Sequence, residues 1–130
     1  MRLRAGIALV LWLAVGAAAV GAQQPESADP ILDRYRAEKS IEVGRYYLKK
    51  GNYDAAIERF QEAALLNPVL ARPHRLLGEV YEKKGEKREA LASYQKYLEI
   101  LPSARDADAV RKRIARLARQ LERGARRRSD

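Results

Sequence analysis

A set of residues recurs at a fixed spacing of 34 positions between residues 37 and 104. Each copy carries an aliphatic residue, two glycines, an alanine, two aromatic residues and a proline in the same register. The first copy consists of Val43, Gly44, Tyr47, Gly51, Ala56, Phe60 and Pro68, and the second of Leu77, Gly78, Tyr81, Gly85, Ala90, Tyr94 and Pro102. A fixed period of this length is the mark of one supersecondary unit repeated in tandem. The chain is therefore constrained to fold as two equivalent units that stack side by side.

The residues of each copy suit two antiparallel helices joined by a short turn. Small residues, such as Gly44 and Ala56 in the first copy, stand where the two helices would approach closely. Gly51 and Gly85 follow the first helix of each unit, where a glycine readily adopts a left-handed backbone conformation. The proline of each copy ends the second helix, because a proline inside a helix removes a hydrogen bond. β-Branched residues are sparse and no period-two alternation occurs, so we expect no strand.

This order of a hydrophobe with Gly and Tyr, then Ala with an aromatic residue, then Pro resembles the tetratricopeptide repeat, a helix–turn–helix unit. The resemblance assigns residues 37–70 to a first repeat and residues 71–104 to a second. It implies an all-α fold, a tetratricopeptide-type α-solenoid of two repeats. It also implies that the first helix of each unit lines a concave groove and that the second helix lies on the convex side.

The pattern of apolar and capping residues predicts five helices, over residues 30–50, 53–66, 72–84, 87–100 and 104–123. Asp29 and Asn52 are the expected N-caps of the first two helices, because their side-chain oxygens accept hydrogen bonds from unpaired backbone N–H groups. Ser103 and Asp106 form an approximate capping box before the fifth helix. The first helix is longer than a repeat requires. Its extra turns carry three apolar residues that we expect to cover the N-terminal edge of the array: Ile31, Leu32 and Tyr35.

The fifth helix is not a third copy of the repeat, because Lys112 and Ala115 stand where its glycine and tyrosine would be. Its apolar residues form one stripe, made of Ala107, Val110, Ile114, Leu117 and Leu121. We interpret this helix as a C-terminal capping helix that covers the last apolar face, as solenoids require. Tyr97 stands where the first repeat has the smaller Ala63, and its ring would then face Ala107 or Ala115 of the cap. Residues 30–123 form the predicted domain, followed by a basic tail over residues 124–130.

Nearly all of the excess positive charge of residues 23–130 lies at the C-terminal end, and Arg2 and Arg4 carry the other two positive charges of the chain. The formal net charge is +9, yet residues 23–104 carry fourteen Lys and Arg against thirteen Asp and Glu, whereas residues 105–130 carry ten against four. This asymmetry leaves an alternative function open, in which the basic helix and tail bind an anionic membrane surface or another polyanion. The residues that would do so are Arg111, Lys112, Arg113, Arg116, Arg119, Arg123, Arg126, Arg127 and Arg128. Nucleic acid is disfavoured, because the tail has no aromatic residues that could stack on bases.

The first 22 residues have the pattern of a signal peptide. Arg2 and Arg4 precede an apolar run over residues 5–20, and small residues follow at the positions that a signal peptidase reads. We expect cleavage after Ala22, a flexible leader over residues 23–29, and an exported protein that is periplasmic or secreted. The alternative is an uncleaved inner-membrane anchor, with the repeats again outside the cytoplasm. The chain has no cysteine, so no disulfide framework stabilises it.

The sequence offers little for catalysis, and we expect neither an enzyme nor a bound cofactor. His74 is the only histidine and is expected to be a half-buried packing residue. With no cysteine and one histidine, the usual zinc ligands are missing. The glycines of the repeats are isolated, so they form no phosphate-binding loop. The function that remains is the binding of a partner at the surface.

The resemblance places that surface in the concave groove, where it implies a peptide or helix of a protein partner. The groove positions carried over to this chain are Glu38, Ile41, Arg45, Leu48, Lys49, Arg72, Arg75, Glu79, Glu82 and Lys83. Its arginines could hold carboxylates through two parallel hydrogen bonds. Some relatives bind the tail of a chaperone through a carboxylate clamp, which has Lys and Asn where Ile41 and Arg45 stand here. This difference disfavours a chaperone tail as the ligand. Because arrays usually need three or more repeats for stability, self-association stays open.

Overall fold

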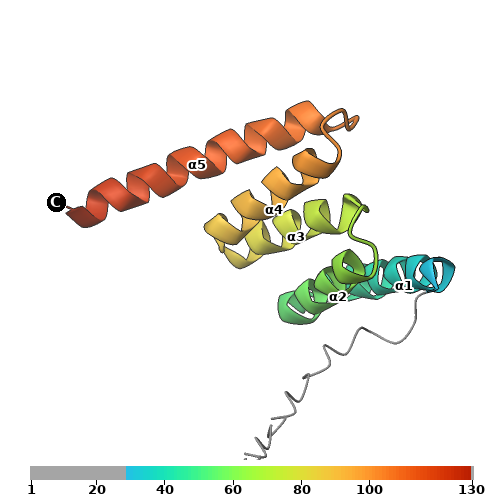
Figure 1. Ribbon diagram of the computed structural model, residues 1–130. Coiled ribbons are helices and arrows are strands. Elements are labelled where there is room, and N and C mark those ends of the chain that lie inside the picture. Colours follow the sequence, from blue (N-terminus) through green and yellow to red (C-terminus); the bar gives the residue numbers. More distant parts are fainter. Residues whose placement is uncertain (1–28, 130) are drawn as a thin grey trace, which may run out of the picture.

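The computed structural model describes residues 29–129, which form five α-helices and no strand (Figure 1). The helices are α1 (Pro30–Lys49), α2 (Tyr53–Leu66), α3 (Arg72–Lys84), α4 (Lys87–Ile100) and α5 (Ala107–Ser129). The bounds predicted for the first four helices are confirmed to within one residue. The predicted signal peptide and nearly all of the leader lie outside the described residues. Within residues 29–129, no helix is both long enough and apolar enough to cross a membrane.

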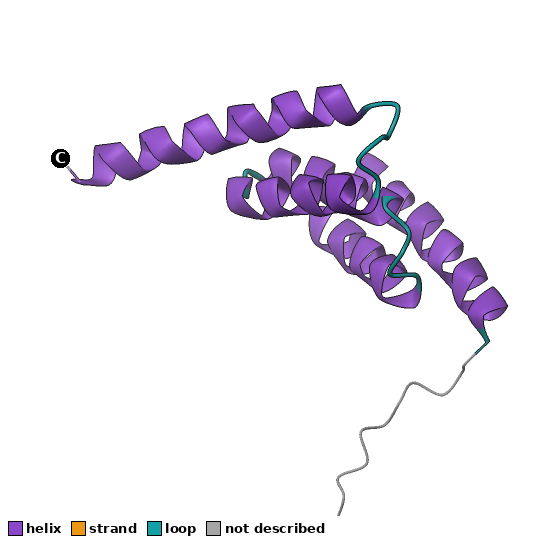
Figure 2. Ribbon diagram, turned by 45° about the horizontal axis from the view of Figure 1, so that its top comes forward, coloured by secondary structure: helices purple, strands orange, loops and turns teal. Residues whose placement is uncertain are grey.

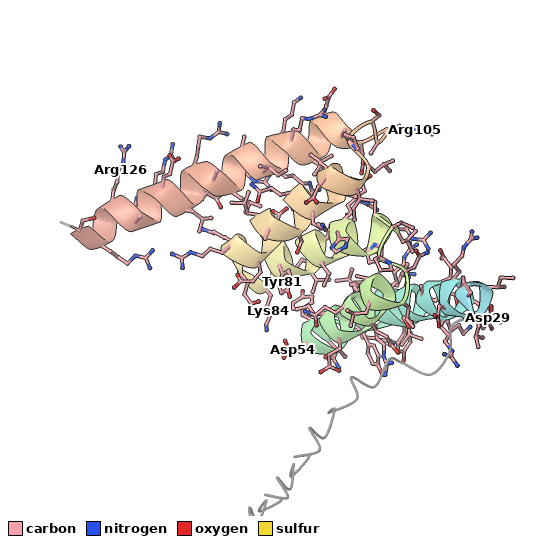
Figure 3. All side chains as sticks on the ribbon, in the orientation of Figure 1. Asp29, Asp54, Tyr81, Lys84, Arg105 and Arg126 are labelled. Carbon is pink, nitrogen blue, oxygen red and sulfur yellow. The ribbon has the colours of Figure 1, made fainter. Side chains whose placement is uncertain are left out.

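Two helical hairpins stack to make an all-α solenoid, which is the predicted fold class (Figure 2). Helix α1 pairs with α2, and α3 pairs with α4. Helix α2 joins the hairpins by packing on α3, and α5 packs on α4 at the far end. Each helix therefore contacts mainly the helices next to it in the chain. Lys84 of α3 also forms an ion pair with Asp54 of α2 at 2.6 Å, which links the two hairpins (Figure 3).

Short-range hydrogen bonds and left-handed glycines set the ends of the helices. The Asp29 carboxylate accepts a hydrogen bond from the Ile31 N–H at 3.0 Å, and the Asn52 side chain accepts one from the Ala55 N–H at 3.3 Å. Both predicted N-caps are thus confirmed. Gly51 and Gly85 have φ values of +73° and +80°, which residues other than glycine rarely adopt. These two turns let each hairpin reverse direction within a few residues.

The two remaining repeat glycines each make room for a buried aromatic ring. A Cβ atom on Gly44 would lie 2.5 Å from the Phe60 ring, and one on Gly78 would lie 2.5 Å from the Tyr94 ring. Both rings are almost fully buried. The close approach predicted from the small residues is therefore a contact between a glycine and an aromatic ring, repeated once in each hairpin. Ala56, also fully buried, lies one helical turn before Phe60.

The core consists of two apolar clusters that meet at α3. The first is built from α1, α2 and α3, and includes Ile41, Phe60 and Val80. The second is built mainly from α4 and α5. The half-buried ring of Tyr81 packs against both clusters, so the core is continuous from one end of the array to the other.

Helix α5 differs from its prediction at both ends. It begins at Ala107 instead of residue 104, and it continues to Ser129 instead of ending at residue 123. The predicted capping box is wrong, because the Asp106 carboxylate accepts a hydrogen bond from the Tyr97 hydroxyl at 2.6 Å and faces Arg75 at 3.6 Å. Alanine and arginine favour helix, and their density carries α5 past Gly124. Residues 124–129 are therefore part of a helix and not a separate tail.

The C-terminal end of the core is covered as expected, whereas the N-terminal edge is not. The apolar stripe of α5 faces α4, with Ala107, Val110 and Leu117 buried, which confirms the cap. Of the two alanines expected opposite Tyr97, Ala107 is buried and Ala115 is exposed. At the other end, Ile31, Leu32 and Tyr35 are exposed, with 79% of the Ile31 surface accessible. They lie in solvent and do not cover the core, which begins at Ala37.

Candidate functional site

One face of the array, formed by α1, α3 and α5, holds two adjoining pockets. The first, of about 200 Å³, lies between α1 and α3 and is lined by Arg45, Leu48, Lys49, Arg72, Arg75, Leu76 and Glu79. The second, of about 490 Å³, lies between α3 and α5 and is lined by Glu79, Glu82, Lys83 and Arg113. Glu79 lines both pockets, so they adjoin each other, and we call the two pockets together the groove.

The structure brings together most of the residues predicted for this surface. Eight of the ten line the two pockets. Glu38 lies beside them, because it forms an ion pair with Arg72. Ile41 does not belong to the groove surface. Its side chain is only 2% exposed and lies in the first core cluster, where a partner cannot reach it.

Sequence reasoning missed two residues of the groove, Leu76 and Arg113. Leu76 is almost fully buried and contributes an apolar floor to the first pocket. Arg113 lies on α5, which was predicted as a cap and, in the alternative, as a polyanion-binding helix that includes Arg113, but not as part of the groove. A signal was nevertheless present, because Arg113 stands 34 positions after Glu79, at the next groove position of the repeat period.

The carboxylates of the groove are all paired with arginines of the same face. Glu38 of α1 pairs with Arg72 of α3, and the Glu79 carboxylate accepts a hydrogen bond from Arg75 at 2.6 Å. Arg75 also faces Asp106, with its Nε atom 3.6 Å from the carboxylate. Arg72 and Arg75 are therefore already engaged with carboxylates of the same face, which partly balance their charges.

Glu82 is the point at which α3, α4 and α5 are joined by polar contacts. Its carboxylate accepts hydrogen bonds from the Tyr94 hydroxyl at 2.8 Å, from Arg113 at 3.1 Å and from Arg116 at 2.6 Å. Burial by itself would raise the pKa of Glu82, but the hydrogen bonds from Tyr94 and Arg113 and the charge of Arg116 bring the pKa below its usual value. Glu82 therefore stays ionised and holds α5 against α3 and α4.

Three cations of the groove have no partner among residues 29–129. Arg45 and Lys49 on α1 and Lys83 on α3 are exposed, and they make neither a hydrogen bond nor an ion pair within this part of the chain. With the carboxylates paired internally, the charge that the groove offers to solvent is positive. Acidic side chains of a partner could meet these cations without displacing any contact described above.

The single histidine lies outside the groove, in a mainly apolar hollow of about 510 Å³ formed by α2, α3 and α4. The side chain of His74 is half-buried there beside Leu65, Leu77 and Lys96, as predicted for a packing residue. Burial lowers the pKa of His74, and the charge of Lys96 lowers it further. Both effects favour the neutral ring. Within the described part of the chain, no group of three or more His, Cys, Asp or Glu side chains could hold a metal ion.

Comparison with known proteins agrees with this architecture. Residues 43–105 match the family model described as "Tetratricopeptide repeat", a span that runs from the middle of α1 to the end of α4. No curated protein matches the chain. Repeats of this family are generally protein–protein interaction modules and typically non-enzymatic scaffolds. The repeated landmarks, the stacked hairpins and the family match together identify the chain as a tetratricopeptide repeat protein.

Proposed function

We propose that this protein is a non-enzymatic scaffold that holds an acidic peptide or helix of a protein partner in the groove. One observation carries the proposal. The groove leaves Arg45, Lys49 and Lys83 without partners, whereas each of its carboxylates is paired with an arginine. An excess of unpaired cations around a depression attracts a segment of opposite charge and disfavours a basic one. The proposed partner is a protein of the cell envelope.

The two pockets suggest how such a segment would be held. The first pocket is small, and Leu48 and Leu76 give it an apolar floor, so it would accept one apolar side chain. Arg45 and Lys49 lie beside this pocket and Lys83 lies beside the next one. Carboxylates on either side of the apolar side chain would then meet all three cations. The apolar contact would supply affinity, and the charges would select the partner and its orientation.

The double substitution Arg45→Glu with Lys49→Glu is expected to remove partner capture. A photo-crosslinking residue placed at Glu42, an exposed position one helical turn before Arg45, would label the partner in the natural envelope, and mass spectrometry would identify it. Two attractive contacts become repulsive in the variant, so the crosslinked yield should fall on the order of 100-fold. The melting temperature should stay unchanged, because both side chains are exposed and unpaired within the described residues.

A matched control for this experiment lies on α4. Lys87→Glu with Arg88→Glu changes the net charge by the same amount at exposed positions outside the groove. Capture should survive in this control. Arg75 is unsuitable for the test, because its reversal would place a third carboxylate beside Glu79 and Asp106 and disturb the fold. Undiminished crosslinking in the Arg45 and Lys49 variant would exclude the groove as the site.

We further propose that the scaffold works outside the cytoplasm, in the periplasm or as a secreted protein. Support comes from Arg2, Arg4, the apolar run that follows them and the small residues before Gln23. Mass spectrometry of the protein isolated from its natural cells should find Gln23 at the N-terminus. A chain that keeps residue 1 and sediments with membranes would favour the anchored alternative. An intact chain in the soluble cytoplasmic fraction would contradict export.

A further inference from the structure

A row of basic side chains follows the outer side of α5, opposite the stripe that packs on α4. Residues three or four positions apart are neighbours on one helix face. That spacing connects Lys112, Arg116, Arg119, Arg123, Arg126 and Arg127, all of which are exposed. We call these six residues the outer row. The opposite side of the helix carries Val110, Ile114, Leu117 and Leu121, which are buried or half-buried.

The outer row is almost entirely free of internal partners. Within residues 29–129, only Arg116 of the six takes part in an ion pair, with Glu82. Glu122 is the one acidic residue of α5 after its first turn. The C-terminal part of helix α5 extends beyond the N-terminal end of α4, and Arg126 projects from this extension (Figure 3). The row spans roughly 22 Å at the usual rise of an α-helix.

The chemistry of the row points to phosphate groups. Five of its six members are arginines, whose planar guanidinium group matches phosphate through two parallel hydrogen bonds. A straight row on a rigid helix can contact a flat layer of phosphates along its whole length, whereas the phosphates of a nucleic-acid duplex follow a curved path. Helix α5 also has no aromatic residue on which unpaired bases could stack. These features favour a membrane surface over nucleic acid.

We propose that the outer row of α5 docks the protein on an anionic lipid surface by contacting headgroup phosphates. Val110, Ile114 and Leu117 of α5 pack in the second core cluster and Leu121 is half-buried, so the helix has no exposed large apolar side chain to insert into the acyl chains. Binding is therefore electrostatic and peripheral. The unpaired groove cations lie on α1 and α3, whereas the outer row lies on α5, so the two sets of unpaired charges are on different helices. The proposal therefore adds a second binding surface to the groove.

Vesicle co-sedimentation tests this proposal with the chain from Gln23 onward, which contains every described helix and omits the apolar N-terminal run. The protein is expected to bind vesicles of phosphatidylglycerol mixed with phosphatidylcholine and not vesicles of phosphatidylcholine alone. Reversing Arg119, Arg123, Arg126 and Arg127 to Glu should weaken binding by about 100-fold or more, since each cation near an anionic surface adds attraction. Raising the salt concentration should weaken binding of the unaltered protein as well.

Two control proteins separate a local effect from net charge and from the groove. Reversal of Arg34, Lys87, Arg88 and Arg105 to Glu removes the same charge from exposed positions elsewhere and should change binding only a few-fold. The groove variant Arg45→Glu with Lys49→Glu should bind vesicles like the unaltered protein, so the proposal can fail while the proposed function holds. If charge reversal loosens the helix, substitution of the same four arginines with Gln removes their charge without reversing it. Vesicle binding should be weakened in this variant as well.

Three results would overturn the proposal. The first is equal binding to neutral and anionic vesicles. The second is an equal loss in the α5 variant and in the variant with the four reversals elsewhere, which would show a net-charge effect. The third is tighter binding, at the same salt concentration, to duplex DNA or to polyglutamate than to anionic vesicles. That result would assign the outer row to nucleic acid or to an acidic protein instead.

Discussion

Replacing Tyr94 with alanine is expected to lower the free energy of unfolding by about 3–5 kcal/mol, the usual cost of deleting a buried aromatic ring. Only 1% of the Tyr94 surface is exposed, and the ring fills the space beside Gly78 in the second core cluster. Its hydroxyl also donates a hydrogen bond to Glu82 at 2.8 Å and accepts one from Arg113 at 3.1 Å. The substitution therefore removes packing and a polar link together. Urea denaturation followed by far-ultraviolet circular dichroism measures the change.

Two further variants help to interpret this loss. One separates the hydroxyl from the ring, and the other is a control at an exposed tyrosine. Tyr94→Phe keeps the ring and removes the hydroxyl, so it should cost about 1 kcal/mol. Tyr46→Ala removes a tyrosine that is 58% exposed, and it should change the stability by no more than about 0.5 kcal/mol. A domain of this size has a free energy of unfolding of about 5–15 kcal/mol, so the loss at Tyr94 would be a large part of it. If Tyr94→Ala proved as mild as Tyr46→Ala, the second core cluster would not be packed as described.

Gly44→Leu and Gly124→Leu are expected to change the free energy of unfolding in opposite directions. Both glycines lie inside helices, where leucine is favoured over glycine by about 0.5–1 kcal/mol. At Gly124 nothing lies within 4 Å of an added Cβ atom, so that gain should appear. At Gly44 the added Cβ atom would lie 2.5 Å from the buried Phe60 ring, and overpacking should cost about 3 kcal/mol. Thermal and urea denaturation of the two variants measure both changes.

The space at Gly44 can be tested further by removing the ring that fills it. Phe60→Ala alone should be strongly destabilising, because the ring is fully buried. In the double variant Gly44→Leu with Phe60→Ala, the leucine can occupy part of the vacated volume. The two changes should therefore cost less together than the sum of their separate costs. Strict additivity would argue against direct contact between position 44 and the ring.

The first four helices could be predicted from the sequence because their ends are set by local chemistry. Asp29 and Asn52 cap helices through atoms two or three residues away, and Gly51 and Gly85 end them through their own backbone angles. Such signals act over a few residues and can be read without the fold. The repeat period then placed the helices relative to one another, because equivalent positions must make equivalent contacts.

The parts that were missed depend on contacts between residues far apart in the chain. Asp106 was assigned to a local capping box, yet its carboxylate is engaged by Tyr97 and Arg75. Ile41 was assigned to the groove from its repeat position, and its burial depends on packing among α1, α2 and α3. The groove residues could be predicted as a set, but not which cations remain unpaired. That distinction is created by ion pairs such as Glu38 with Arg72, which the tertiary fold brings together.

The predominance of contacts between helices that are neighbours in sequence has a consequence for how the chain folds. Every extensive interface joins segments that are adjacent in sequence, so few long loops must close before favourable contacts form. Topologies of this kind have low contact order and belong to the fastest-folding proteins. Either hairpin can fold first, and the other can then fold against it. If the exported chain proposed here reaches its destination unfolded, it could therefore fold promptly there, without any disulfide to guide it.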